Sequence, residues 1–227
     1  DAQESRGLGD VYKRQTKNIV KAAPVLWGKK IVEEQEAVRA VVVNTGIANA
    51  CTGAQGYENV VTEAKEVGAL LDIKPEEVVV GSTGVIGQQL PMDVIKEGIK
   101  KLVPELKADR QSEEDASWAI LTTDTKPKEA AVEVEIAGKT VTIAGMCKGS
   151  GMIHPNMATT LNFVTTDVAV TTEMVQKALS DIVKVTYNCL SIDGDTSTND
   201  MVSVMANGLA GNKEITAEGE DLSLIHI

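Results

Sequence analysis

The stretch Lys148–Thr159, which reads KGSGMIHPNMAT, decides how the rest of this chain is interpreted. Its last residue, Thr159, opens a strand-like run over 159–166 and directly follows a small residue, Ala158. A hydroxyl at such a junction can attack the preceding carbonyl, and hydrolysis of the ester then frees Thr159 as a new N-terminus. The freed α-amine, whose pKa would lie near 8, can act as the nucleophile's own general base. The junction is therefore a candidate for self-cleavage, and the alternative is an ordinary Ala-Thr pair at a strand start.

Three other side chains of this stretch carry possible chemistry. Lys148 and Ser150 could form a Ser/Lys nucleophile pair, but Lys148 stands where the G-x-S-x-G elbow needs its first glycine. His154 is a candidate base for which the sequence offers no partner acid, so a loop histidine with a local hydrogen bond is the simpler interpretation.

Outward from this stretch, apolar spacing predicts mixed helices and strands. We expect strands at 40–44, 76–81 and 159–166, a hairpin of 131–136 with 140–144, and helices at 58–71, from Pro91, and over 172–190. Ser112 and Asp115 have the spacing of a capping box before a helical segment at 116–121. This mixture predicts an α/β fold class with mixed α+β layers.

A second segment of small polar residues, Ser82-Thr83-Gly84, follows the strand predicted at 76–81. Backbone N–H groups in such a segment can hold an anion or an oxyanion, and Gly84 allows close approach of the backbone. The alternative is a plain strand-to-helix turn in which Gly84 supplies a positive φ. A P-loop is excluded, because no Gly-Lys-Ser/Thr follows.

The composition argues against several classes of binding partner. A net charge of −11 and few aromatic residues (3%) argue against nucleic acid, since phosphate binding needs clustered Lys and Arg. No run of about 18 apolar residues exists, so we expect no transmembrane helix and no membrane partner. The odd, widely spaced cysteines favour a reducing, cytoplasmic setting. Cys51, Cys147 and Cys189 form no C-x-x-C pair, so we expect neither a zinc site nor a disulfide framework.

The two ends resemble translated sequencing adapter. Residues 10–15 (DVYKRQ) and 222–227 (LSLIHI) can be encoded by inverted copies of one nucleotide sequence, the transposase-end adapter used in library preparation. We therefore expect residues 1–15 and 222–227 to be adapter-derived, with the natural segment running from about 16 to 221.

Six segments together resemble the ornithine acetyltransferase family, the bifunctional glutamate N-acetyltransferases known as ArgJ. They are KAAPV (21–25), NTGIANACTG (44–53), GSTGVIG (81–87), TTDTKPK (122–128), KGSGMIHPNMAT (148–159) and DGDTSTND (193–200). The resemblance covers essentially the whole natural segment, and the family usually has Asn where this chain has Ile47. It implies an incomplete DmpA/ArgJ-like fold.

The resemblance implies a precursor that cleaves itself between Ala158 and Thr159. Residues 16–158 would then be the C-terminal part of an α chain, and 159–221 the N-terminal part of a β chain. Thr159 would carry the acetyl group from N-acetylornithine to glutamate. Thr83 and Gly84 match the pair that stabilises the oxyanion. Thr122, Lys148 and Thr159 match substrate-contacting positions, with Thr123 a close rival for Thr122.

The same resemblance implies no metal and no organic cofactor, with acetyl-CoA as a co-substrate of some members. It suggests paired αβ units, and it leads us to expect that the 227-residue chain alone is not a competent enzyme. Two alternatives stay open: an N-terminal-nucleophile aminopeptidase of related fold, and a non-catalytic domain that binds a small molecule.

Overall fold

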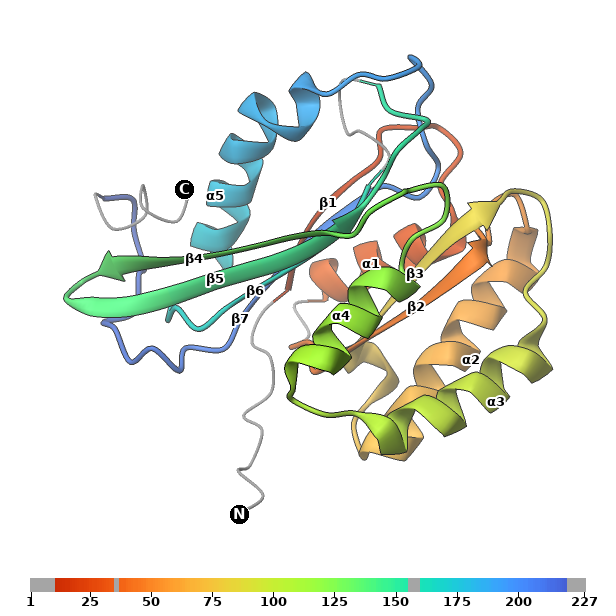
Figure 1. Cartoon of the computed structure of the whole chain (residues 1–227), viewed down its shortest axis with the longest axis horizontal. Helices are drawn as coiled ribbons and strands as arrows, with labels where there is room; N and C mark the ends of the chain where they lie inside the picture. The colour runs from red at the N-terminus through yellow and green to blue at the C-terminus, as the bar shows by residue number, and fades with distance from the viewer. Residues whose placement is uncertain (1–10, 35–36, 155–159, 220–227) are drawn as a thin grey trace.

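The computed structural model describes residues 11–34, 37–154 and 160–219, which form two sheets with helices on their outer faces (Figure 1). The smaller sheet pairs β2 (Ala40–Ile47) and β3 (Val78–Val85) in parallel. The larger sheet has the strand order β1-β7-β6-β5-β4. Its strands are β1 (Val11–Gln15), β4 (Lys128–Ile136), β5 (Lys139–Lys148), β6 (Leu161–Thr166) and β7 (Met201–Ala206).

The parallel pair is covered by α1 (Ala23–Glu33), α2 (Gly53–Leu71) and α3 (Met92–Leu102). In α2, Val60, Ala64 and Val67 recur at helical spacing and are buried against the buried residues of β3. The indole Nε1 of Trp27 in α1 donates to the Val78 carbonyl at 2.9 Å and fixes that helix on β3. These local patterns explain why this half of the chain forms a helix-covered parallel pair.

Strand β7 lies inside the larger sheet and is buried on both faces. It pairs in parallel with β6 and antiparallel with β1. Met201 and Met205 join the core of the helix-covered pair, whereas Val202 and Ala206 join a second core under α5 (Thr172–Val185). Because side chains alternate between the faces of a strand, β7 ties the two cores together.

The two sheets face one another, with α1, α2 and α3 outside one sheet and α5 outside the other (Figure 1). Gly81 in β3 permits the close approach: a Cβ at this position would lie 3.4 Å from the Phe163 ring and 3.6 Å from Met201. This arrangement confirms the mixed α+β layers predicted from the sequence.

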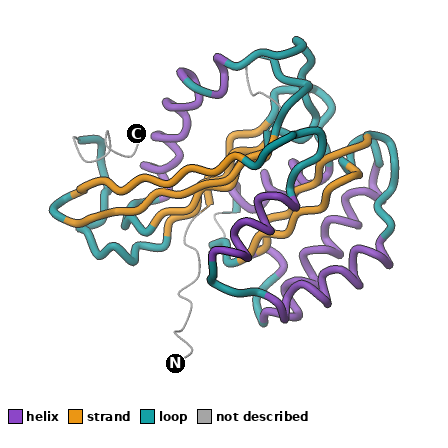
Figure 2. The backbone as a smooth tube through the Cα atoms, viewed as in Figure 1, coloured by secondary structure: helices purple, strands orange, loops and turns teal. Residues whose placement is uncertain are grey.

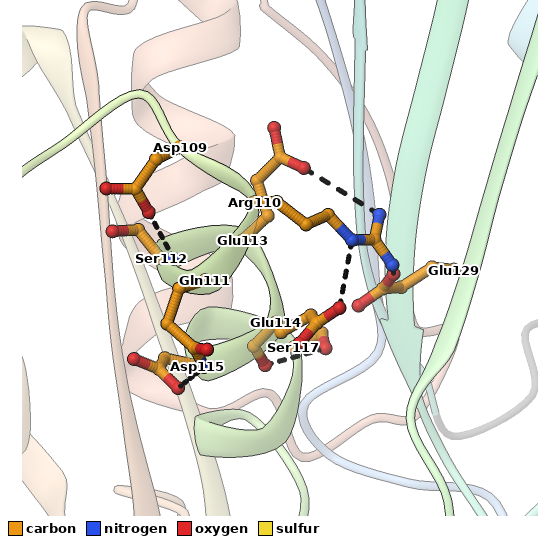
Figure 3. Close-up of polar contacts among 9 residues, drawn as sticks. All are labelled: Asp109, Arg110, Gln111, Ser112, Glu113, Glu114, Asp115, Ser117 and Glu129. Carbon is orange, nitrogen blue, oxygen red and sulfur yellow. Dashed lines mark hydrogen bonds and ion pairs between the residues drawn. The ribbon is translucent and has the colours of Figure 1, made fainter.

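The predicted capping box at Ser112 and Asp115 is wrong. Helix α4 (Arg110–Ala119) begins earlier, and its N-cap is Asp109, whose carboxylate accepts the Ser112 backbone N–H at 2.8 Å (Figure 3). Ser112 is thus the capped residue and not the cap. Arg110 pairs with Glu114 in its own helix and reaches Glu129 of β4, so it joins α4 to the edge of the larger sheet (Figure 3).

Other differences concern boundaries. The helix predicted over 172–190 ends at Val185 and is followed by a short 3-10 turn, Tyr187–Cys189. Both strands of the parallel pair extend beyond the predictions, to Ile47 and Val85. The sequence reading missed α1 and β7, while β1 falls in the residues attributed to adapter, an attribution that stays a prediction. Within the described ranges, no helix has the length and apolarity needed to cross a membrane.

Candidate active site

The candidate site lies where β5 ends and where β6 and β7 begin. The register places Lys148 opposite Leu161, and Leu161 opposite Met201. The residues that precede the two parallel strands, Thr160 and Asp200, are therefore neighbours beside Lys148, and the Met201 N–H donates to the Thr160 carbonyl at 2.9 Å. Loops gather at this end of the larger sheet (Figure 2). The sheet thus brings together segments separated by up to about fifty residues in sequence.

Thr83 and Gly84 reach this site from the facing sheet. They lie inside β3, opposite Thr45 and Gly46 of β2, so the interpretation of 82–84 as a turn is wrong. The predicted positive φ of Gly84 is confirmed at 132°. A Cβ on Gly84 would lie 2.2 Å from the carbonyl carbon of Gly46, so only glycine fits where these strands meet.

A buried hydrogen bond joins the two sheets at this point. The Lys148 ammonium donates to the Thr83 hydroxyl at 2.9 Å, and the two residues are 5% and 7% exposed. Thr83 points toward the larger sheet because it is two residues beyond Gly81 on the same face of β3. The bond places a cationic group beside one of the two residues that the sequence assigned to oxyanion stabilisation.

Burial lowers the pKa of Lys148, because an ammonium loses hydration there. The carboxylates of Asp124 and Asp200 oppose this effect, and the charge of Lys128 adds to it. Asp124 accepts the Gly149 N–H at 2.8 Å and pairs with Lys128. Burial would raise the pKa of Asp124, but those bonds and charges outweigh burial, so its pKa is lowered.

Asp200 is the most deeply buried carboxyl of the site, at 1% exposed. Neither of its oxygens has a hydrogen-bond partner in the described part of the chain. Burial raises its pKa to about 7, against smaller opposing effects from Ser197, the Thr160 backbone, Thr16 and Lys148. These nearby donors compensate only part of the effect of burial, and a carboxyl with so strongly raised a pKa is more common at functional sites than elsewhere.

Asn199, next to Asp200, fixes the parallel pair against this end of the larger sheet. Its Nδ2 donates to the carbonyls of Ala48 and Ser82, at 2.6 and 2.8 Å. The residue is buried, and its two bonds hold the backbone just before Thr83. Asn199 therefore orients the strand that carries Thr83 and Gly84.

Asp193 holds the loop that precedes the predicted cleavage bond. Its carboxylate accepts the N–H groups of Met152 and Ile153, and the Ile192 N–H donates to the Ile153 carbonyl at 2.9 Å. These hydrogen bonds, first that from Met152, lower the pKa of Asp193. The loop is therefore pinned to the segment that leads to Asn199 and Asp200.

The remaining predicted residues are placed as follows. Thr122 is exposed, and its neighbour Thr123 contacts the glycine-rich loop through a 2.6 Å hydrogen bond between its hydroxyl and that of Ser150. Lys148 bonds to Thr83, so the structure gives no Ser/Lys pair with Ser150. His154 is exposed.

Ala158 and Thr159 lie outside the described residues, so the cleavage site and the nucleophile stay predictions. Their neighbour Thr160 is described and is 7% exposed at the site. Among the described residues there is no cluster of three or more His, Cys, Asp or Glu that could hold a metal ion.

The sequence reading assigned no role to Asp124, Asp193, Asn199 or Asp200, although all four stand in segments quoted above. The sequence feature that could have identified them is their short polar side chains near predicted strand ends, where ligand sites are common. Asp200 and Asn199 could be placed only once β7 was recognised, because they directly precede it.

Comparison with known proteins finds a matching family model and similar sequences. The family model described as "ArgJ family" matches residues 6–224. The arginine biosynthesis bifunctional protein ArgJ of Staphylococcus epidermidis is 48% identical over 206 residues, 91% of this chain and 51% of the relative. That of Symbiobacterium thermophilum is 52% identical over 88% of this chain and 49% of the relative. The chain thus spans about half the length of the curated relatives it matches.

Two solved structures are similar in fold. A crystal structure of ArgJ from Bacillus halodurans has a TM-score of 0.59 at 44% identity, covering 65% of this chain and 75% of the other. Ornithine acetyltransferase from Mycobacterium tuberculosis, complexed with ornithine, has a TM-score of 0.59 at 37% identity, covering 68% and 79%. With a family model that matches nearly its whole length, this chain belongs to the ArgJ family.

Proposed function

We propose that this chain is a segment of an acetyltransferase of arginine biosynthesis, which moves an acetyl group from N-acetylornithine to glutamate. The observation that carries the proposal is the buried hydrogen bond between Lys148 and Thr83, beside Thr160. It joins two residues that the family resemblance assigned to one active site. Membership of the ArgJ family and the ornithine-bound relative support the same reaction.

The reaction begins with self-cleavage. The Thr159 hydroxyl attacks the Ala158 carbonyl carbon and forms an ester, the peptide C–N bond breaks, and the nitrogen takes up the proton that the hydroxyl gives up. Water then hydrolyses the ester, which leaves a carboxyl on Ala158 and a free amine on Thr159. Asp193 supports this step because it holds the backbone at Met152 and Ile153, a few residues before the bond that breaks.

Acetyl transfer follows a ping-pong route. The Thr159 hydroxyl attacks the acetyl carbonyl, its proton passes to the amide nitrogen, and the C–N bond breaks. Ornithine then leaves as the amine, and the acetyl group remains as an ester on Thr159. The amine of glutamate then attacks the ester, and the threonine oxygen recovers its proton. Thr83 and Gly84 stabilise the oxyanion, an effect that is worth about 3–4 kcal/mol per donor in other enzymes. Lys148 pairs with a substrate carboxylate, and we propose the same contact role for Thr122 or its neighbour Thr123.

No metal or organic cofactor enters this route, and acetyl-CoA could replace N-acetylornithine as the acetyl donor. We propose that self-cleavage gives α and β chains that assemble as paired αβ units. Because the chain spans about half of its relatives, we expect the 227-residue chain alone to lack transacetylase activity.

The test is acetyl transfer from N-acetylornithine to labelled glutamate by the full-length precursor. We expect Thr159→Ala to abolish both cleavage and transfer. Thr165→Ala, which removes an exposed threonine of β6, is the matched control and should leave both intact. Cleavage that persists in the Thr159→Ala precursor would overturn the nucleophile assignment.

The same assay separates the two alternatives. Peptide hydrolysis without transfer to glutamate would identify an aminopeptidase, in which water replaces glutamate as the acceptor. A precursor that stays in one piece and binds a small molecule without turnover would identify a binding domain.

A further inference from the structure

A chain of hydrogen bonds between side chains runs along the start of β6. The Tyr187 hydroxyl donates to Oδ1 of Asn162 at 3.0 Å, and Nδ2 of Asn162 donates to the Thr160 hydroxyl. Asn162 is 2% exposed and Thr160 is buried, while Tyr187 is half-buried in the short turn after α5. Thr160 directly follows Thr159 in sequence, so the chain of bonds ends next to the proposed nucleophile.

These side chains lie on the face of the larger sheet that α5 covers (Figure 1). Leu161 and Phe163, the neighbours of Asn162 in β6, belong to the core of the helix-covered pair. Because side chains alternate along a strand, Asn162 points to the opposite face. There it meets Tyr187, which packs against the second core, under α5.

The bond between Lys148 and Thr83 lies on the other face of the same sheet. Lys148 is opposite Leu161 in the register, and its ammonium reaches Thr83 in the facing sheet. The bonds of Asn162 therefore hold the start of β6 from behind, away from the groups proposed to contact the substrate. This separation predicts that they affect the reacting residue and leave substrate binding unchanged.

An asparagine at this position is unusual, because its surroundings are otherwise apolar. Its register partners are Cys147 in β5 and Val202 in β7, and Val202 belongs to the second core. A buried amide costs free energy unless its oxygen and nitrogen are both bonded, and the two bonds of Asn162 meet this requirement. An apolar residue would have no such requirement, so what the amide adds is the directed bond to Thr160.

Tyr187 fixes the orientation of that amide. A phenol that donates to Oδ1 leaves Nδ2 to face Thr160, whose hydroxyl then accepts a bond. Burial raises the pKa of Tyr187 to about 12, and the charge of Cys147 adds to this effect, so the phenol is protonated at neutral pH. Thr160 is also held through its backbone, because its carbonyl accepts the Met201 N–H at 2.9 Å. Side-chain and backbone bonds thus fix the residue that follows the proposed nucleophile.

We propose that Tyr187 is a positioning residue, which acts through Asn162 on Thr160 and so orients the backbone that carries the nucleophile Thr159. This inference deepens the proposed function and rests on it, since it concerns the same nucleophile. It assigns a role in the reaction to the turn after α5, on the outer side of the larger sheet. A reacting group that is slightly misplaced attacks a carbonyl carbon more slowly, so the loss of this chain of bonds should appear in the rate.

The experiment compares Tyr187→Phe with the wild type in the full-length precursor, made by cell-free synthesis so that cleavage can be followed from the start. We expect self-cleavage to slow about tenfold, the effect of one buried hydrogen bond. In acetyl transfer by the cleaved enzyme, kcat should fall about tenfold, whereas KM for both substrates should stay within about twofold. Tyr57→Phe is the matched control: Tyr57 is a half-buried tyrosine of α2, and its variant should match the wild type.

Variants at the other end of the chain of bonds separate this role from a merely structural one. Thr160→Val removes the hydroxyl that accepts from Asn162 and should slow both reactions at least as much as Tyr187→Phe. Thr160→Ser keeps a hydroxyl and should be slower than the wild type by less than about threefold. Tyr187→Phe combined with Thr160→Val should be no slower than Thr160→Val alone, because both changes break the same chain of bonds.

A Tyr187→Phe precursor that cleaves and transfers at wild-type rates would overturn the inference and leave the proposed function intact. A raised KM with unchanged kcat, or losses that multiply in the double variant, would do the same. If Tyr187→Phe does not fold, Thr160→Val and Thr160→Ser decide, and equal rates for these two would overturn the inference. A wild-type precursor that neither cleaves nor transfers would overturn the proposed function, and the inference would fall with it. Cleavage without transfer would overturn acetyl transfer alone, and the cleavage rates would still test the role of Tyr187.

Discussion

Glu63 should make the stability of this protein depend strongly on pH. It lies on the inner face of α2 and is 2% exposed, and its Oε2 atom has no hydrogen-bond partner among the described residues. Burial raises its pKa from 4.5 to about 8. In the folded protein this carboxyl is therefore protonated at neutral pH, whereas in the unfolded chain it is ionised.

The direction and the size of the effect follow from this difference. The folded state holds the proton more tightly, so the free energy of unfolding falls as pH rises from 4.5 toward 8 and then levels off. At about 1.4 kcal/mol per pKa unit, the loss is about 1 kcal/mol at pH 5 and about 3 kcal/mol at pH 7. It approaches about 5 kcal/mol above pH 8.

Glu63→Gln removes the titrating proton and keeps the shape of the side chain. We expect its free energy of unfolding, relative to wild type, to rise by about 2 kcal/mol between pH 5 and pH 7. Urea unfolding followed by fluorescence measures this, since Trp27 is 2% exposed in the same core. Glu58→Gln, on the exposed side of α2, is the control and should show no such change. Parallel pH curves for the Glu63 variant and wild type would refute the reasoning.

Two other substitutions test the framework of the site. Gly84→Ala should destabilise the protein by about 3–5 kcal/mol and abolish acetyl transfer, because the new Cβ would lie 2.2 Å from Gly46. Gly98→Ala has open space in α3 and should instead stabilise by about 0.5–1 kcal/mol in the same urea titration. Asn199→Ala should cost about 2–4 kcal/mol, because it leaves two buried carbonyls of the parallel pair without a donor. An unfolding midpoint equal to that of the wild type would contradict the expectation for that variant.

The elements that the sequence predicted are those whose signal is local. The helix over 58–71 was predicted from the helical spacing of its apolar residues, and the strands at 40–44 and 76–81 from short apolar runs. The hairpin was predicted from the turn residues Ala137-Gly138 between two alternating runs. Strand β7 was missed because its residues, apart from Ser203, are all apolar. A short run buried on both faces has no polar face to reveal its period.

The site shows the same difference between residues with a local sequence signal and contacts that depend on the fold. Thr83, Gly84 and Lys148 were named from the sequence, and the structure brings Thr83 and Lys148 into contact. That contact joins residues 65 apart, so no local pattern could predict it. The capping box failed for a related reason: Asp109, three residues before Ser112, offered the better acceptor, and the sequence pattern alone did not rank the two.

The bonds of Asn199 have a consequence for the order in which the protein folds. They span 151 residues to Ala48 and 117 to Ser82, so they close some of the longest loops in the chain. Long-range contacts form late, because the entropy of loop closure must be overcome before they stabilise anything. We therefore expect the strand that carries Thr83 and Gly84 to reach its final position only after residues 199–206 have joined the sheet. A chain that still lacks residues 199–206 could form its helices and the hairpin of β4 and β5. Without the bonds of Asn199, however, Thr83 and Gly84 would not be aligned to stabilise an oxyanion.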